Sequence, residues 1–222
     1  MMGKAPLTLY LGNKNYSSWS LRPWLALKHA GATFEEVVIP LDTPQTDATI
    51  RAVSPAGRVP ILRHGEVTVW DSLAIIEYVA ELFPHSHLWP EPREARAMAR
   101  SVSAEMHSGF AALRKACPMD FRGRRSEPVS TPEVLADVRR VAELWTDCRR
   151  RYGREGRFLF GAFTAADCMF APVVSRFLTY GVELTGVPSS YVEAIQTVPS
   201  WQEWAAAAKA EALPMTRYGP TP

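Results

Sequence analysis

The sequence lacks most of the features that mark specialised classes of protein. Its 222 residues include three cysteines, Cys117, Cys148 and Cys168, whose wide spacing fits neither a disulfide framework nor a metal site. Lysine and arginine number 25 against 23 acidic residues, so the net charge of +2 is too small for a nucleic-acid-binding surface. We therefore expect reduced cysteines, no bound metal and no nucleic-acid partner.

The chain also lacks long apolar runs, internal repeats and low-complexity tracts. No segment approaches the ~20 apolar residues of a membrane helix, and the first six residues lack the apolar core of a secretory signal. With 47% hydrophobic residues, the chain is long enough for one large domain or two small ones. We expect a cytoplasmic protein that does not associate with membranes.

The first half of the chain alternates strand and helix patterns. Because proline is tolerated without loss only in the first turn of a helix, Pro23 makes Ser20 a better N-cap than Ser18 for the first helix. The alternation predicts two parallel strands joined by a helix, followed by an antiparallel hairpin, which is a small mixed α/β sheet. The expected strands are 7–11, 34–39, 59–62 and 67–70, and the expected helices run from residue 21 to about 31, over 46–53, and onward from residue 71 or 72.

The second half has no convincing strand pattern. Pro84, Pro90 and Pro92 punctuate a linker, after which apolar residues recur at helical spacing over 95–116, 132–151, 164–178 and 199–212. The charged segment 122–132 is expected to be an exposed loop. We predict an α/β domain over 6–84, a linker over 85–92, an all-helical domain over 93–213 and a tail over 214–222.

A serine-rich turn follows the first predicted strand and could bind an anion. Tyr16, Ser17, Ser18 and Ser20 lie where the free amides and positive end of a helix favour negative charge. No His or Asp adjacent in sequence could make a serine nucleophilic, but a hydroxyl can donate to a ligand thiolate and lower a thiol pKa from about 8.5. The alternative is that these serines simply cap the helix.

Two further motifs could hold a peptide-like ligand. In Arg58-Val59-Pro60, a cis bond before the proline would turn the Val59 backbone outward to pair with an extended ligand. Asp71-Ser72 opens a helix and could bind a carboxylate through the Ser72 hydroxyl and free amides. An ordinary edge-strand proline and simple helix capping are the alternatives.

In this order, the motifs resemble the thioredoxin-like first domain of the cytosolic glutathione transferases. Residues 17–22, Ser-Ser-Trp-Ser-Leu-Arg, are similar to the zeta-class signature Ser-Ser-Cys-Ser-Trp-Arg. Thr164-Ala-Ala-Asp167, followed by Pro172, resembles that class's capping box and helix proline, which serve folding. The resemblance covers nearly the whole chain, and it implies a thioredoxin-like α/β domain followed by an all-α domain.

The resemblance also implies a glutathione site in a homodimer. Ser17 is the best candidate to stabilise the glutathione thiolate, and Ser18 follows. The other implied glutathione contacts are Val59 and Pro60 for the cysteinyl part, Ser72 for the γ-glutamyl carboxylate, Asp71, from either subunit, for the ammonium group, and Gln45 or Arg58 for the glycyl carboxylate.

The electrophilic acceptor would occupy a pocket between the domains. Its candidate lining is Trp19, Met106, His107, Phe110 and Arg176, with Arg176 favouring carboxylate-bearing acceptors. Alternatively, Met106 and Phe110 belong to the core, His107 is a core or exposed histidine, and Arg176 pairs with an acidic residue such as Glu105.

The expected activity is that of a bacterial, zeta-like glutathione transferase that adds glutathione to a small electrophile. Trp19 stands where the zeta class has cysteine, and Pro23 where it has an aliphatic residue, which argues against isomerisation of maleylacetoacetate. A glutathione-dependent cis-trans isomerase is one alternative. A binding module without turnover is another.

Overall fold

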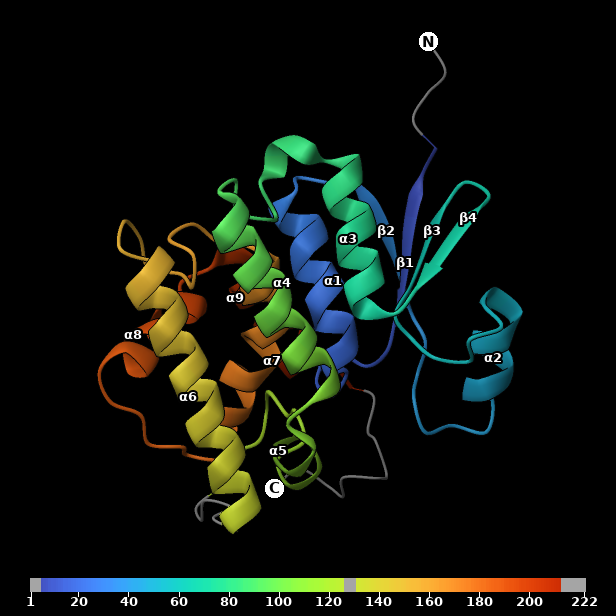
Figure 1. The fold of residues 1–222 in the computed structure, drawn as a ribbon. Helices are drawn as coiled ribbons and strands as arrows, with labels where there is room; N and C mark the ends of the chain where they lie inside the picture. Colours follow the sequence, from blue (N-terminus) through green and yellow to red (C-terminus); the bar gives the residue numbers. More distant parts are fainter. Residues whose placement is uncertain (1–4, 126–130, 213–222) are drawn as a thin grey trace.

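The computed structural model describes residues 5–125 and 131–212, which form a mixed sheet joined to a group of helices (Figure 1). The strands are β1 (Leu7–Leu11), β2 (Phe34–Val38), β3 (Ile61–His64) and β4 (Val67–Trp70), in the order β2-β1-β3-β4. Strand β1 is parallel to β2 and antiparallel to β3, and β3 and β4 form a hairpin. The predicted sheet is confirmed, although β3 begins two residues later than expected.

Helices cover both faces of this sheet. Helices α1 (Ser18–His29) and α3 (Ser72–Leu82) lie between the sheet and the helical half of the molecule, and α2 (Thr46–Val53) lies on the other side (Figure 1). The period-two pattern of β1 buries Leu9 and Leu11 completely. On the α2 side, Ile50 packs in a separate small cluster with Ile39 and Ile61.

Helix α1 begins earlier than the sequence predicts. Its N-cap position is Ser17, so the prediction of Ser20 is wrong, and Pro23 lies inside the helix. The hydroxyl of Ser20 accepts hydrogen bonds from the Gly12 N–H at 3.1 Å and from Ser17 Oγ at 2.8 Å. Because it is bonded to the preceding loop, Ser20 does not cap the helix, and the helix accommodates a proline beyond its first turn.

The second half of the described chain is helical. The expected helix over 95–116 is two helices, because Phe110 adopts the left-handed backbone conformation with φ of 58°. The sequence did not predict α8, and α9 ends two residues early. The elements are η1 (Pro84–Ser86), α4 (Arg93–Ser108), α5 (Ala111–Ala116), α6 (Pro132–Tyr152), α7 (Ala165–Thr179), α8 (Val187–Gln196) and α9 (Pro199–Ala210).

Part of the expected exposed loop over 122–132 is not exposed, because Gly123 is buried; residues 126–130 of that prediction lie outside the described chain. The three cysteines are buried and unpaired. Within the described ranges, no helix is both long and apolar enough to cross a membrane.

Helix α7 is the central helix of this half, and nearly all of its residues are buried. The predicted capping box is present at its start. Asp167 Oδ2 accepts from the Thr164 N–H at 2.8 Å and from the Thr164 hydroxyl at 2.9 Å, and Oδ1 accepts from the Leu159 N–H at 3.2 Å. Burial raises the pKa of Asp167 to about 6, although these hydrogen bonds oppose the shift.

Candidate functional site

The loop between β1 and α1 is held in place by the helical half. Asn15 Nδ2 donates to Asp120 Oδ1 at 2.8 Å. The Glu211 carboxylate accepts from the backbone N–H groups of Lys14 and Asn15 at 2.8 and 3.1 Å. Arg122 Nη2 donates to the Tyr16 hydroxyl at 3.1 Å. The loop that carries the candidate serines is therefore fixed from outside its own domain.

The two candidate serines make different hydrogen bonds. Ser17 Oγ donates to Ser20 Oγ at 2.8 Å, and Ser18 Oγ accepts from Arg176 Nη2 at 3.1 Å. Both side chains are buried. Ser17 makes no side-chain cap of α1, so helix capping does not explain its presence.

A cavity of about 550 Å³ opens in front of these serines, and we call it the serine cavity. Arg58, Arg114 and Arg176 contribute positive charge to its lining, and Asp42 contributes negative charge. The remaining lining residues are Tyr16, Ser17, Ser18, Trp19, Leu41, Thr46, Ile50, Gly57, Val59, Pro118 and Met119.

A second cavity, of about 610 Å³, lies beside the first, and we call it the Asp71 cavity. Trp19, Arg58 and Val59 line both cavities, so the two are neighbours. Its other lining residues are Ala56, Pro60, Trp70, Asp71, Ser72 and His107. The Val59–Pro60 bond is cis, as predicted.

Asp71 and Ser72 contribute polar groups to the Asp71 cavity, beside Arg58 and His107. Asp71 Oδ1 caps α3 by accepting from the N–H groups of Leu73 and Ala74 at 2.9 and 3.3 Å, so the capping alternative holds for this oxygen. Its Oδ2 lies 3.1 Å from His107 Nε2. The buried Ser72 hydroxyl has no hydrogen-bond partner among the described residues. A buried polar group without a partner is costly, so this hydroxyl is suited to bind a ligand.

The structure brings most, but not all, of the predicted site residues together. Met106 and Phe110 are buried in the main core and line neither of these two cavities, which agrees with the core alternative; helical periodicity cannot separate core from pocket. Gln45 is exposed before α2 and also lines neither cavity. His107 lines the Asp71 cavity and not the serine cavity that Arg176 lines.

The sequence assigned no role to Arg22, which is 1% exposed and packs against Trp19, a residue that lines both cavities. Its guanidinium lies 4.4 Å from the ring centre of Trp19, and that of Arg114 lies 5.2 Å from the same ring. Burial and the charges of Arg176 and Arg114 lower the pKa of Arg22 to about 9, so it stays charged at neutral pH. Its Nε and Nη1 have no hydrogen-bond partner among the described residues. The motif contained Arg22, but its burial depends on tertiary packing.

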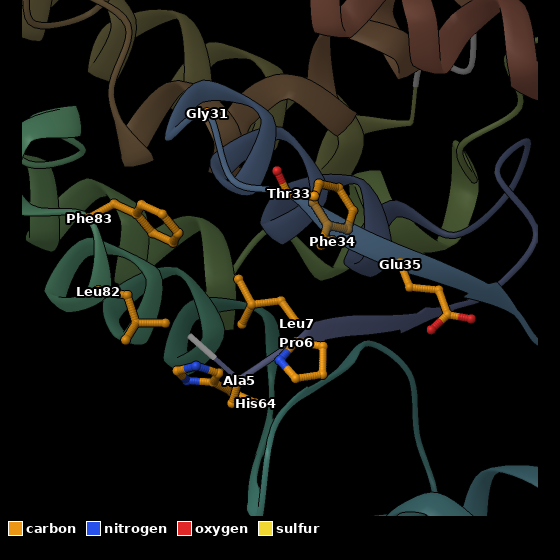
Figure 2. A pocket seen from close by; sticks show the side chains of 10 residues that line it. All are labelled: Ala5, Pro6, Leu7, Gly31, Thr33, Phe34, Glu35, His64, Leu82 and Phe83. Carbon is orange, nitrogen blue, oxygen red and sulfur yellow. The ribbon is translucent and has the colours of Figure 1, made fainter. Parts of the chain in front are cut away.

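A third cavity, of about 510 Å³, lies away from these residues (Figure 2). Its lining is mainly apolar and includes Leu7, Phe34, Leu82 and Phe83. Its one histidine, His64, is hydrogen-bonded through Nδ1 to the Tyr78 hydroxyl at 2.8 Å. None of the predicted site residues lines it. Across the described part of the chain, no cluster of His, Cys, Asp and Glu has the makings of a metal site.

Comparison with known families accounts for this arrangement of motifs. The model of the glutathione S-transferase N-terminal domain matches residues 16–82, and that of the C-terminal domain matches residues 102–207. The chain belongs to the glutathione S-transferase family. This confirms the family resemblance of the sequence and its two-part fold.

Individual relatives agree with a zeta-like member of this family. The chain is 27% identical over 187 residues to maleylacetoacetate isomerase from Rattus norvegicus, with 82% of each chain covered. It is 26% identical over 191 residues to glutathione S-transferase 1 from Dianthus caryophyllus, again with 82% of each covered. A solved glutathione transferase homologue from Burkholderia gl BGR1, with bound glutathione, has a TM-score of 0.69 and 27% identity, covering 94% of this chain and all of that one.

Proposed function

We propose that the chain is a glutathione transferase that stabilises the glutathione thiolate with a serine hydroxyl and adds it to a small electrophile. The observation that carries this proposal is the meeting of Ser17, Ser18 and Arg176 in one cavity. A thiolate there would accept a hydroxyl hydrogen bond in a field of positive charge. The buried Ser72 hydroxyl in the neighbouring cavity, which no described residue hydrogen-bonds, supports a ligand that spans both cavities.

In this proposal, glutathione would span the two cavities as an extended tripeptide. Its sulfur would lie at the serines, and its cysteinyl backbone would pair with Val59, beside Pro60. Its γ-glutamyl carboxylate would accept from Ser72, and its ammonium group would face Asp71. Arg58 lines both cavities and is the better candidate for the glycyl carboxylate, because Gln45 lines neither.

Catalysis would consist of ionising the thiol and positioning the acceptor beside it. Three arginines and one aspartate line the serine cavity, so its lining favours an electrophile that carries a carboxylate. Arg114 and Arg176 are the candidates to bind that carboxylate, and Trp19 supplies an apolar wall. Glutathione is the only co-substrate that this scheme uses, and it involves no metal.

The relatives named maleylacetoacetate isomerase support glutathione-dependent cis-trans isomerisation as a second candidate. In isomerisation the thiol adds to the substrate and leaves again, so glutathione is not consumed. A binding module would bind glutathione and turn nothing over. We also propose a cytoplasmic homodimer: Val67 and Trp70 on the edge strand β4 are 46% and 49% exposed and could be covered by a second copy.

Mass balance separates these functions. The purified protein is incubated with glutathione and a panel of neutral and carboxylate-bearing electrophiles, and glutathione, electrophile and product are quantified together. A transferase consumes glutathione and electrophile one for one. Isomerised product with no loss of glutathione identifies the isomerase, and binding without product across the panel identifies the module.

A further inference from the structure

We propose that Ser18, oriented by Arg176, donates the hydrogen bond that stabilises the thiolate, and that Ser17 does not. The inference rests on the proposed function and decides between its two serines. It depends on where each hydroxyl proton already points. A serine hydroxyl has one proton to donate and two lone pairs with which to accept, so a hydroxyl already donating cannot also donate to a thiolate.

The Ser17 proton is already used inside the protein. Ser17 Oγ donates to Ser20 Oγ at 2.8 Å, and this bond is buried. Ser20 Oγ also accepts from the Gly12 N–H at 3.1 Å, so it belongs to the framework that holds the β1–α1 loop. For Ser17 to donate to a thiolate, this bond would have to break. Ser17 is therefore a structural link between the loop and the first turn of α1.

Ser18 has the opposite arrangement. Its oxygen accepts from Arg176 Nη2 at 3.1 Å, and no hydrogen bond among the described residues uses its proton. A hydroxyl that accepts from a charged donor is polarised and becomes a stronger donor itself. Ser18 lines the serine cavity, so this proton is available to a ligand there.

Arg176 is well placed to orient Ser18. Its side chain is 5% exposed, and its Nη1 donates to the backbone carbonyl of Cys117. The alternative partner, Glu105, instead pairs with Arg140 at 2.7 Å. Arg176 is thus held between the chain after α5 and the start of α1, with one nitrogen on Ser18. For stabilisation of the thiolate it is a positioning residue, because it acts on the sulfur through the serine.

The surrounding charge favours an anion at the same point. Arg114 and Arg176 line the serine cavity, and Arg22 is buried against the ring of Trp19, with two nitrogens that no described residue hydrogen-bonds. A buried positive charge that lacks a full set of partners gains when an anion arrives nearby. Arg22 and Arg114 therefore add to the effect of Ser18, and Asp42, which lines the same cavity, opposes it.

The test is the thiol pKa of glutathione bound to the intact protein, measured by the ultraviolet absorbance of the thiolate as a function of pH. The variants are Ser17→Ala, Ser18→Ala, Arg176→Met, Arg176→Lys and the double variant Ser18→Ala with Arg176→Met. Ser103→Ala is the matched control, because Ser103 is a buried serine on α4 that lines neither cavity. Thermal unfolding of each variant shows which ones fold.

We expect Ser18→Ala to raise the bound thiol pKa by about one unit, and Ser17→Ala to raise it much less. Arg176→Met should raise it similarly, Arg176→Lys should restore part of the shift, and the double variant should differ little from Ser18→Ala. If Arg176→Met does not fold, the bound thiol pKa of Arg176→Lys is compared with that of the wild type instead. A large rise of the bound thiol pKa in Ser17→Ala, with no rise in Ser18→Ala, would overturn this inference but would leave the proposed function standing. A wild-type protein that leaves the thiol pKa of glutathione unchanged overturns the proposed function itself.

Discussion

The Nε2 atom of His107 lies 3.1 Å from Oδ2 of Asp71, so that α4 contacts the residue that caps α3. The other oxygen of Asp71 is held by the N–H groups of Leu73 and Ala74, which fixes the carboxylate on both sides. His107 also meets the ring of Trp19 edge-on, with ring centres 5.2 Å apart. His107 thus contacts both Asp71 and Trp19, and Trp19 lines both cavities.

Replacing His107 with alanine should weaken glutathione binding about 3- to 10-fold, because Asp71 loses one of the groups that orient it toward the ammonium. His107→Gln, which keeps a donor, should recover part of the affinity. Calorimetry with glutathione and with cysteinylglycine, which lacks the γ-glutamyl group, is the measurement. Cysteinylglycine binding should change little, and an equal loss for both ligands would show that His107 does not act through Asp71.

Ser72→Ala should raise the dissociation constant of glutathione by about 10-fold or more, because a buried hydroxyl would lose its bond to a carboxylate. Ser103→Ala is a matched control: its hydroxyl is also buried and unpartnered among the described residues, but it lines neither cavity. Calorimetric titration of both variants checks this. Similar affinities for the two variants would remove Ser72 from the glutathione site.

Arg114→Leu should raise KM for electrophiles that carry a carboxylate about 10-fold and change KM for neutral electrophiles of the same size much less. Arg139→Leu removes the same charge from an exposed position on α6, outside both cavities, and serves as the control. Steady-state kinetics with matched pairs of acceptors measure the difference. Equal losses with charged and neutral acceptors would mean that Arg114 does not select the acceptor.

The buried Asp167 makes stability depend on pH. Its folded-state pKa is raised from 3.8 to about 6, so between these values the folded chain holds a proton that the unfolded chain has released. The stability contributed by this group is therefore fully present below pH of about 4 and is lost as pH rises through about 6.

Asp167→Asn cannot titrate and should be less stable by about 1–3 kcal/mol, because an amide cannot accept from all the donors that Asp167 does. The advantage of the wild type over this variant should be larger at pH near 4 than at pH near 7. Denaturant unfolding at the two pH values measures it. An advantage of the same size at both would contradict the raised pKa.

Much of the fold could be predicted because local patterns determine it. The strand over 7–11 and the helix over 46–53 have the predicted bounds, since the strand carries a period of two and the turn residues over 54–57 end the helix. The start of α1 was misjudged because Pro23 suggested a later beginning, and loop contacts of Ser20 override that local preference. Helix α8 was missed: proline and two serines open it, and its segment reads locally as a turn.

The candidate site was less predictable because its chemistry depends on contacts between distant residues. The motif located Ser17 and Ser18, but only the structure shows that one donates to Ser20 and the other accepts from Arg176, 158 residues away. Met106 and His107 are neighbours in the sequence, yet one is core and the other lines a cavity. No sequence pattern separates such cases.

Thiolate formation on binding is the central claim, and proton release tests it most directly. Binding of glutathione is measured by calorimetry at neutral pH in buffers with different ionisation enthalpies, with S-methylglutathione, which has no thiol proton, as the control. Since a free thiol has a pKa of about 8.5, a site that stabilises the thiolate must release protons to the buffer when glutathione binds. The account predicts that glutathione releases a large fraction of one proton more than S-methylglutathione does. Equal proton release by the two ligands would contradict it.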